Sequence, residues 1–153
     1  ANGLLSRIGN VDGKDAIATV TAIAQRYGFT SSEELRTLTG MASGNAVENW
    51  TSTRDCGSFL SQVYAGTLVS KNASERMMQL LLGQTRRTKI PAGVPSGVKV
   101  ANKTGELAAV QNDVAIVFGT HPYVLAVMSS DISSAVAPSQ ITELSRAVWD
   151  AAQ

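Results

Sequence analysis

Apolar residues recur at helical spacing along the first part of the chain, and this spacing predicts helices separated by short breaks. Asp12 is the predicted N-terminal cap of the second helix, and Ser52-Thr53-Arg54-Asp55 open the third with an arrangement that resembles a capping box. Between residues 29 and 49 no period persists, which predicts a loop. The predicted helical segments are 4–9, as the end of a helix that begins elsewhere, 12–28, 52–66, and one that begins at Asn72 or Ser74 and ends before Gly83.

The period changes from helical to strand-like in the last third of the chain. Thr120-His121-Pro122 is a tight connection that predicts an antiparallel hairpin. A closing helix is predicted after Pro138-Ser139, with Ile141, Leu144 and Val148 among the residues that face inward. Helices followed by an antiparallel unit and a final helix indicate the α+β class. The predicted strands are 98–103, 113–119 and 123–129.

Composition and charge narrow the classes of function. The sequence has 153 residues, 44% of them hydrophobic and 16% charged, with a net charge of +1. Without a basic stripe there is no case for nucleic acid or a charged membrane surface as a partner. No apolar stretch approaches the ~20 residues of a membrane span. One His and one Cys cannot furnish a zinc site, so no metal or other cofactor is predicted.

The candidate chemistry lies in Lys103-Thr104-Gly105-Glu106, between a stretch of alternating polarity and an apolar run. A Lys-Thr-Gly sequence in a strand puts an ammonium, a hydroxyl and a bare backbone on one exposed edge. Those groups can bind the anionic end of a substrate and let its backbone lie along the strand. A solvated strand lysine is the alternative interpretation, but glycine weakens a simple strand, which favours the functional one.

Lys103-Thr104-Gly105 is one of the three motifs of the penicillin-recognising serine hydrolases. With its flanks, residues 84–95 and 112–117, it resembles the C-terminal half of class A β-lactamases and their relatives. Residues 50–55 resemble the start of the helix after the omega loop, and residues 4–9 resemble the helix just past the Ser-x-Asn loop. The resemblance spans nearly the whole chain. It implies one composite domain with a mostly helical part, 1–95, which includes an omega-like loop, and a sheet-forming part, 96–153.

The resemblance implies catalytic and substrate-binding roles for the motif. Lys103 would lend positive potential beside the nucleophile and, with Thr104, bind the carboxylate of the substrate. Gly105 would keep the edge of the strand clear for the acyl group. The backbone N–H of Glu106 would supply one arm of the oxyanion hole, worth ~3 kcal/mol of transition-state stabilisation.

Two motifs of the family are not found at their expected positions. No serine precedes a lysine by three residues within a predicted helix, and the Ser-x-Asn motif is likewise not evident. In the family both motifs lie N-terminal to the residue that Ala1 matches. We therefore expect a missing N-terminal segment, possibly a separate chain, to supply the nucleophile and further strands of the sheet. The chain alone is expected to be inactive, because an oxyanion donor without an activated nucleophile accelerates little.

Other departures bear on the reaction. Class A β-lactamases carry Glu-x-x-Leu-Asn in the omega loop, whereas Glu48 is the only carboxylate in residues 36–49 and its context differs. Without that base an acyl-enzyme would be long-lived, which favours a penicillin-binding or peptidase-like relative over an efficient β-lactamase. The positions of the family's substrate-binding arginines hold Gln111 and Pro91. Arg86-Arg87 are the alternative cations, although a solvated turn is the simpler interpretation.

Two hypotheses of function follow from the resemblance. In the first, the chain is part of an exported serine hydrolase that acts by acyl transfer on a β-lactam or a D-alanyl peptide. In the second, it belongs to a non-catalytic relative that keeps the fold as a binding or scaffolding domain. A Ser-x-x-Lys sequence in the missing segment would support the first hypothesis, and its loss would support the second.

Overall fold

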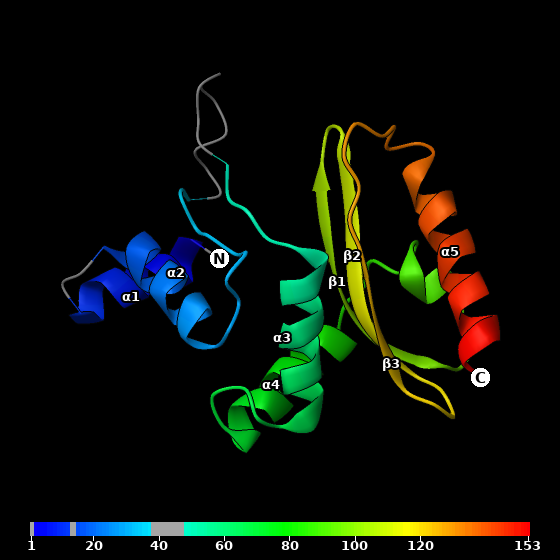
Figure 1. The fold of residues 1–153 in the computed structure, drawn as a ribbon, viewed down its shortest axis with the longest axis horizontal. Coiled ribbons are helices and arrows are strands. Elements are labelled where there is room, and N and C mark those ends of the chain that lie inside the picture. The colour runs from blue at the N-terminus through cyan, green and yellow to red at the C-terminus, as the bar shows by residue number, and fades with distance from the viewer. Residues whose placement is uncertain (1, 13–14, 38–47) are drawn as a thin grey trace. The chain divides into compact units, whose positions relative to one another are not determined.

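The computed structural model describes residues 2–12, 15–37 and 48–153 (Figure 1). The chain folds into two compact units, which meet in the sequence between Asp55 and Cys56. The predicted parts, 1–95 and 96–153, reflect the content of helix and strand, whereas these units reflect packing.

The first unit contains two helices that pack against each other, α1 (Asn2–Asp12) and α2 (Ala16–Arg26). The prediction that Asp12 caps the second helix is wrong, because Asp12 is the last residue of α1. Asp15 is the cap instead, and its carboxylate accepts a hydrogen bond of 3.0 Å from the Ile17 N–H. Both aspartates precede the same apolar stripe, so spacing alone did not separate them.

The segment after α2 forms no regular element in its described residues. An isolated antiparallel bridge joins Glu33 to Trp50, and Asn49 Oδ1 accepts hydrogen bonds from the N–H groups of Leu35 and Arg36 at 2.8 and 2.9 Å. The predicted loop is confirmed in residues 29–37, apart from this bridge, and residues 38–47 lie outside the described ranges.

The second unit is built on an antiparallel sheet with the order β1-β2-β3. Its strands are β1 (Lys99–Leu107), β2 (Val110–Phe118) and β3 (Tyr123–Val127). The predicted hairpin of the last two strands is confirmed. β1 extends four residues beyond its predicted end at Lys103, because Thr104, Gly105, Glu106 and Leu107 all pair with residues of β2. The Lys-Thr-Gly sequence therefore lies inside a paired strand.

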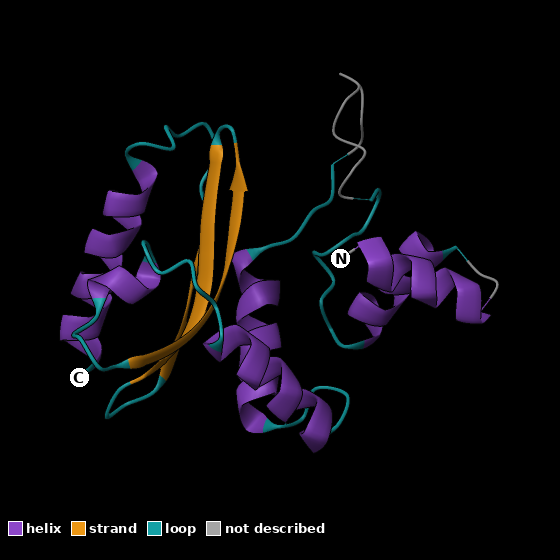
Figure 2. Ribbon diagram, turned by 180° about the vertical axis from the view of Figure 1, so that it is seen from behind, coloured by secondary structure: helices purple, strands orange, loops and turns teal. Residues whose placement is uncertain are grey.

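Helices cover both faces of this sheet (Figures 1 and 2). One face packs on α5 (Ala137–Ala152) and on the short 3₁₀ helix η1 (Ile90–Gly93). The other face packs on α3 (Thr53–Ala65) and α4 (Lys71–Leu82). The first core contains Ile90, Val100, Ala115, Val117 and Ile141; the second contains Leu60, Ala101 and Ile116.

The closing helix is confirmed, but its buried face differs from the prediction. Ile141 is buried as predicted, whereas Leu144 is 46% exposed. The buried face instead contains Ala137 and Ser145, and the Ser145 hydroxyl donates a hydrogen bond of 2.9 Å to the Ile90 carbonyl. Small residues let α5 approach η1 closely, which turns Leu144 away from the core.

Serine hydroxyls cap the two helices on the opposite face. Ser52 Oγ accepts a hydrogen bond of 3.1 Å from the Asp55 N–H, which confirms the serine half of the predicted capping box of α3. The Asp55 carboxylate, its predicted acidic half, accepts hydrogen bonds from the Ser31 N–H and Ser32 Oγ at 2.8 and 2.7 Å.

The cap of α4 is Ser70, whose Oγ accepts a hydrogen bond of 3.2 Å from the Ala73 N–H. Of the two predicted starts, Asn72 is one residue after the first helical residue, Lys71, and Ser74 is about one turn too late. None of the helices in the described ranges has the length and apolar content needed to cross a bilayer.

Candidate active site

The Lys-Thr-Gly sequence presents its side chains to alternating faces of β1. Lys103 and Gly105 lie on the same face as Ala101, which packs with Leu60 of α3. Thr104, which is 8% exposed, lies on the face that packs against α5 and η1. The Lys103 side chain is exposed, so its ammonium is directed to the surface on the α3 and α4 side of the sheet.

The hydrogen bonds of Gln111 show which backbone N–H and carbonyl groups of β1 are not paired with β2. Its N–H donates to Ser129 Oγ at 3.2 Å, and its carbonyl accepts from the same hydroxyl at 2.6 Å. Gln111 therefore directs its peptide groups away from its partner Glu106, and the two form a non-hydrogen-bonded pair. It follows that the N–H and carbonyl of Glu106 point to the free edge of β1 in the described sheet. Because the pattern alternates along a strand, the N–H and carbonyl of Thr104 also point to the free edge, and this carbonyl accepts a hydrogen bond from the Lys103 ammonium.

The Glu106 carboxylate lies between two cations on the other side of the strand. Lys89 Nζ donates to Glu106 Oε1 at 3.1 Å, and Arg86 Nη1 lies 2.5 Å from Oε2. The hydrogen bond from Lys89 lowers the pKa of Glu106, and the charges of Lys89, Arg86 and Lys103 act in the same direction. Arg87 Nη1 donates to the Val100 carbonyl at 3.3 Å. Both arginines are thus tied to β1.

A buried polar pair lies directly behind the motif. Asp113, with no exposed surface, accepts hydrogen bonds of 3.0 Å from Asn102 Nδ2 and from the Ile90 N–H. Burial raises the pKa of the Asp113 carboxyl. Asn102 Nδ2 also donates to the Arg86 carbonyl at 3.3 Å, while its Oδ1 is buried without a partner. Sequence analysis missed this pair, although two polar residues at inward positions of facing strands were a usable signal.

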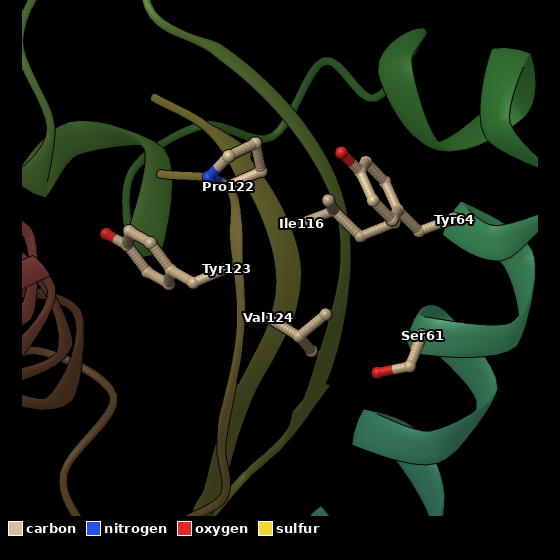
Figure 3. Close-up of a pocket in the computed structure, with 6 residues that line it drawn as sticks. All are labelled: Ser61, Tyr64, Ile116, Pro122, Tyr123 and Val124. Atoms are coloured by element: carbon tan, nitrogen blue, oxygen red, sulfur yellow. The ribbon is translucent and has the colours of Figure 1, made fainter. Parts of the chain in front are cut away.

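An apolar hollow of about 240 Å³ lies between α3 and the sheet. Figure 3 shows Ser61 and Tyr64 of α3 facing Ile116 and Val124, whereas Tyr123 points to the opposite face. Ile116 pairs with Ala101, one rung of the same face away from the pair of Lys103 and Val114. The hollow therefore opens on the same side of the sheet as Lys103.

No helical Ser-x-x-Lys sequence is found in the described residues. Ser96 and Lys99 have the spacing, but they span a turn at Gly97, with φ of +91°, and the start of β1. Ser43-Gly44-Asn45 has the spacing of the Ser-x-Asn motif and lies outside the described residues. Glu48 is 2.5 Å from Arg36 Nη2 in an ion pair, and its side chain is 53% exposed.

Comparison with known proteins identifies the family and the fold of the chain. A model of the β-lactamase enzyme family matches residues 6–152. The β-lactamase of Sphaerobacter thermophilus DSM 20745 is 22% identical with a TM-score of 0.85, and the match covers 97% of this chain and 57% of that chain. PBP-A is 25% identical with a TM-score of 0.78, covering 88% and 51%. The extended-spectrum β-lactamase TLA-1 is 25% identical with a TM-score of 0.81, covering 88% and 54%.

No match was found among curated proteins. The chain spans just over half the length of each of these three solved structures. The predicted family and the predicted α+β, β-lactamase-like fold are confirmed, while the roles assigned to Lys103, Thr104, Gly105 and Glu106 stay predictions. The chain belongs to the β-lactamase enzyme family.

Proposed function

We propose that this chain forms one wall of the active site of a serine hydrolase that acts by acyl transfer on a β-lactam or a D-alanyl peptide. The main support for this proposal is that the Glu106 N–H and the Thr104 peptide groups point to the free edge of β1, beside the exposed Lys103 ammonium. A backbone N–H at a free edge is available to a developing oxyanion, and such a donor is worth ~3 kcal/mol.

The proposed roles combine these backbone positions with the roles that the family resemblance implies. The ammonium of Lys103 provides positive potential next to the attacking serine and the substrate carboxylate. The resemblance, rather than the side-chain positions, gives Thr104 a hydrogen bond to that carboxylate, because its side chain lies on the opposite face of β1 and is 8% exposed. The Glu106 N–H would stabilise the tetrahedral oxyanion. Gly105 leaves room for the substrate on the face of Lys103, because it places no side chain there.

The nucleophile would come from polypeptide outside this sequence, either an N-terminal segment of the same protein or a separate chain. The extent of the match supports this, since the chain corresponds to just over half of each structure it resembles. Although the residues of β3 on the opposite face are half-buried too, Val114, Val124 and Ala126 are half-buried on the face that carries Lys103 and leave apolar surface for such a segment. A segment that packs on these residues would bring its serine beside Lys103. The isolated chain would then be inactive.

Slow deacylation is the expected property of the complete enzyme. The sequence lacks Glu-x-x-Leu-Asn, and the ion pair with Arg36 engages Glu48. A water-activating carboxylate is therefore not evident in the described residues, which favours a penicillin-binding or peptidase-like activity over rapid β-lactam hydrolysis. Such an enzyme would be exported and act on cell-wall chemistry outside the cytoplasm.

Covalent labelling of the full-length protein tests this function. We expect a fluorescent penicillin to form a one-to-one adduct whose mass increase equals that of the intact penicillin, because ring opening releases no leaving group. The same penicillin, hydrolysed beforehand, is the control and should give no adduct. A folded full-length sample that takes up no label would contradict the acyl-transfer proposal and would favour the non-catalytic binding relative.

A further inference from the structure

Lys89 is buried more completely than any other charged side chain in the described residues except Asp113. Its relative exposure is 1%, and its ammonium contacts Glu106 Oε1 and the Asn112 carbonyl, both at 3.1 Å. A buried ammonium is costly unless it is paired and hydrogen-bonded. A surface loop would not ordinarily bury a lysine, so the position of this side chain calls for a function.

The residue after Lys89 is linked to the other end of the Lys-Thr-Gly sequence through Asp113. The Ile90 N–H donates to Asp113 Oδ2 at 3.0 Å, and Asp113 Oδ1 accepts from Asn102 Nδ2 at 3.0 Å. Asn102 immediately precedes Lys103, and Glu106 immediately follows Gly105. Lys89-Ile90 therefore holds β1 on both sides of the motif, and we call this dipeptide the bracket.

The bracket is itself fixed to α5. The Thr142 hydroxyl is shared between the Thr88 and Lys89 carbonyls, each at 3.2 Å. Ser145 Oγ donates to the Ile90 carbonyl at 2.9 Å. Because the Lys89 and Ile90 carbonyls are held by the helix, the side chain of Lys89 starts from a fixed backbone. Its ammonium can then restrain Glu106 rather than follow it.

We infer that Lys89 is a positioning residue for the oxyanion donor of the proposed acyl-transfer reaction. Within Glu106, the carboxylate points toward Lys89, while the N–H points to the free edge of β1. Holding the carboxylate and the neighbouring Asn112 carbonyl limits rotation of the peptide between Gly105 and Glu106. The donor then keeps its direction when the substrate arrives, and no reorganisation is needed during the reaction. This inference rests on the proposed function.

Kinetics of acylation distinguish positioning from general support of the fold. In the full-length protein, K89M removes the ammonium at similar length, and K99M makes the same change at an exposed lysine of β1. With a reporter penicillin, we expect K89M to lower the first-order acylation constant by about tenfold or more, with the dissociation constant of the initial complex changed less than about threefold. K99M should alter neither constant.

Loss of fold would reduce the fraction of protein that reacts and leave the rate constant of that fraction unchanged. An acylation constant of K89M within about twofold of the parent would overturn the inference. If K89M does not fold, E106Q provides the test, since its side chain is 32% exposed and it keeps the shape of the carboxylate. The acylation constant of E106Q should fall severalfold, and an unchanged constant would overturn the inference.

A second readout separates this inference from the proposed function. If the parent protein forms no adduct, hydrogen exchange at the Gly105 amide still reports on the bracket, because Gly105 pairs with Asn112, whose carbonyl contacts Lys89. Faster exchange there in K89M, but not in K99M, would support positioning by Lys89 even though acylation had failed. Equal exchange in the parent and K89M would reject it.

Discussion

Asn102 Nδ2 lies 3.0 Å from Asp113 Oδ1, and neither residue has any exposed surface. The two face each other diagonally across β1 and β2, and Asp113 is the direct strand partner of Thr104. Through the Ile90 N–H, the same carboxylate connects the sheet to η1. A single buried carboxylate thus links the strand of the motif to the helical layer behind it.

Removing this carboxylate should destabilise the protein. Asp113→Ala leaves the Ile90 N–H and Asn102 Nδ2 buried with one partner fewer, and unsatisfied buried donors cost about 1–3 kcal/mol each. We expect the free energy of unfolding of the full-length protein to fall by about 2–4 kcal/mol in denaturant titrations. Asp150→Ala, at an exposed position of α5, is the control and should change it by less than about 0.5 kcal/mol. Similar losses in both variants would refute the role of Asp113.

The ion pair of Glu106 predicts a dependence of stability on pH. The cations lower the pKa of Glu106 from its ordinary value of 4.5, so the folded state releases this proton more readily than the unfolded state. The resulting stabilisation is present above pH 4.5 and is lost as the pH falls through the lowered value. Asp113, whose pKa is raised, contributes in the opposite direction in the parent and in E106Q alike. E106Q should therefore lose less stability than the parent on acidification from about pH 6 to pH 3. Parallel curves would show that the pair contributes nothing.

The strand that carries the candidate residues could be predicted from sequence, but its full extent could not. Alternation and the apolar run of β2 sufficed to predict the sheet and its hairpin. The predicted end of β1 at Lys103 was too early, because Thr104, Gly105 and Glu106 give no apolar signal. Their pairing is supplied by β2, which is a non-local contact that a window of sequence does not contain.

The surroundings of the motif were harder to predict for the same reason. Lys89 lies in a segment rich in proline and glycine, which predicts a solvated loop. Its burial depends on Glu106 and Asn112, which are 17 and 23 residues away. The inward direction of Leu144 also failed, since α5 meets η1 through Ser145, whose hydroxyl donates to the Ile90 carbonyl and which hydrophobic periodicity does not count.

Packing of η1 against α5 predicts a strong effect at Gly93. A Cβ at this position would lie 2.4 Å from the Thr142 carbonyl oxygen and 2.6 Å from Ser145 Cβ, and a backbone atom cannot move aside cheaply. Gly93→Ala should lower the free energy of unfolding by about 2–3 kcal/mol. Gly57→Ala is the matched control, because a Cβ there meets no atom within 4 Å and Gly57 lies inside α3. It should stabilise the helix by about 0.5–1 kcal/mol. A mild effect at Gly93 would mean that η1 and α5 are less closely packed.

A substitution at Gly105 should affect acylation much more than the free energy of unfolding. A Cβ there would make ordinary contacts of 3.5 Å with Asn112 Cβ, and its φ is not positive, so alanine fits the strand. Gly105→Ala should change the free energy of unfolding by less than about 1 kcal/mol. Its methyl group would, however, occupy the face on which the substrate is proposed to lie. We expect penicillin acylation of the full-length protein to slow by about tenfold or more, with Gly57→Ala unaffected. Equal acylation in the parent and Gly105→Ala would place the substrate elsewhere.

The ion pair between Arg36 and Glu48 leads to a prediction about the second half of the reaction. A carboxylate that activates water must be free to accept its proton, whereas Glu48 lies 2.5 Å from a guanidinium nitrogen and at the surface. Glu48→Gln should therefore leave the rate of deacylation within about twofold of the parent, as measured by the decay of the penicillin adduct in intact mass spectra. Glu75→Gln, an exposed carboxylate of α4, is the control and should behave in the same way. An adduct that persists much longer in Glu48→Gln alone would identify Glu48 as the base and would contradict the proposed slow deacylation.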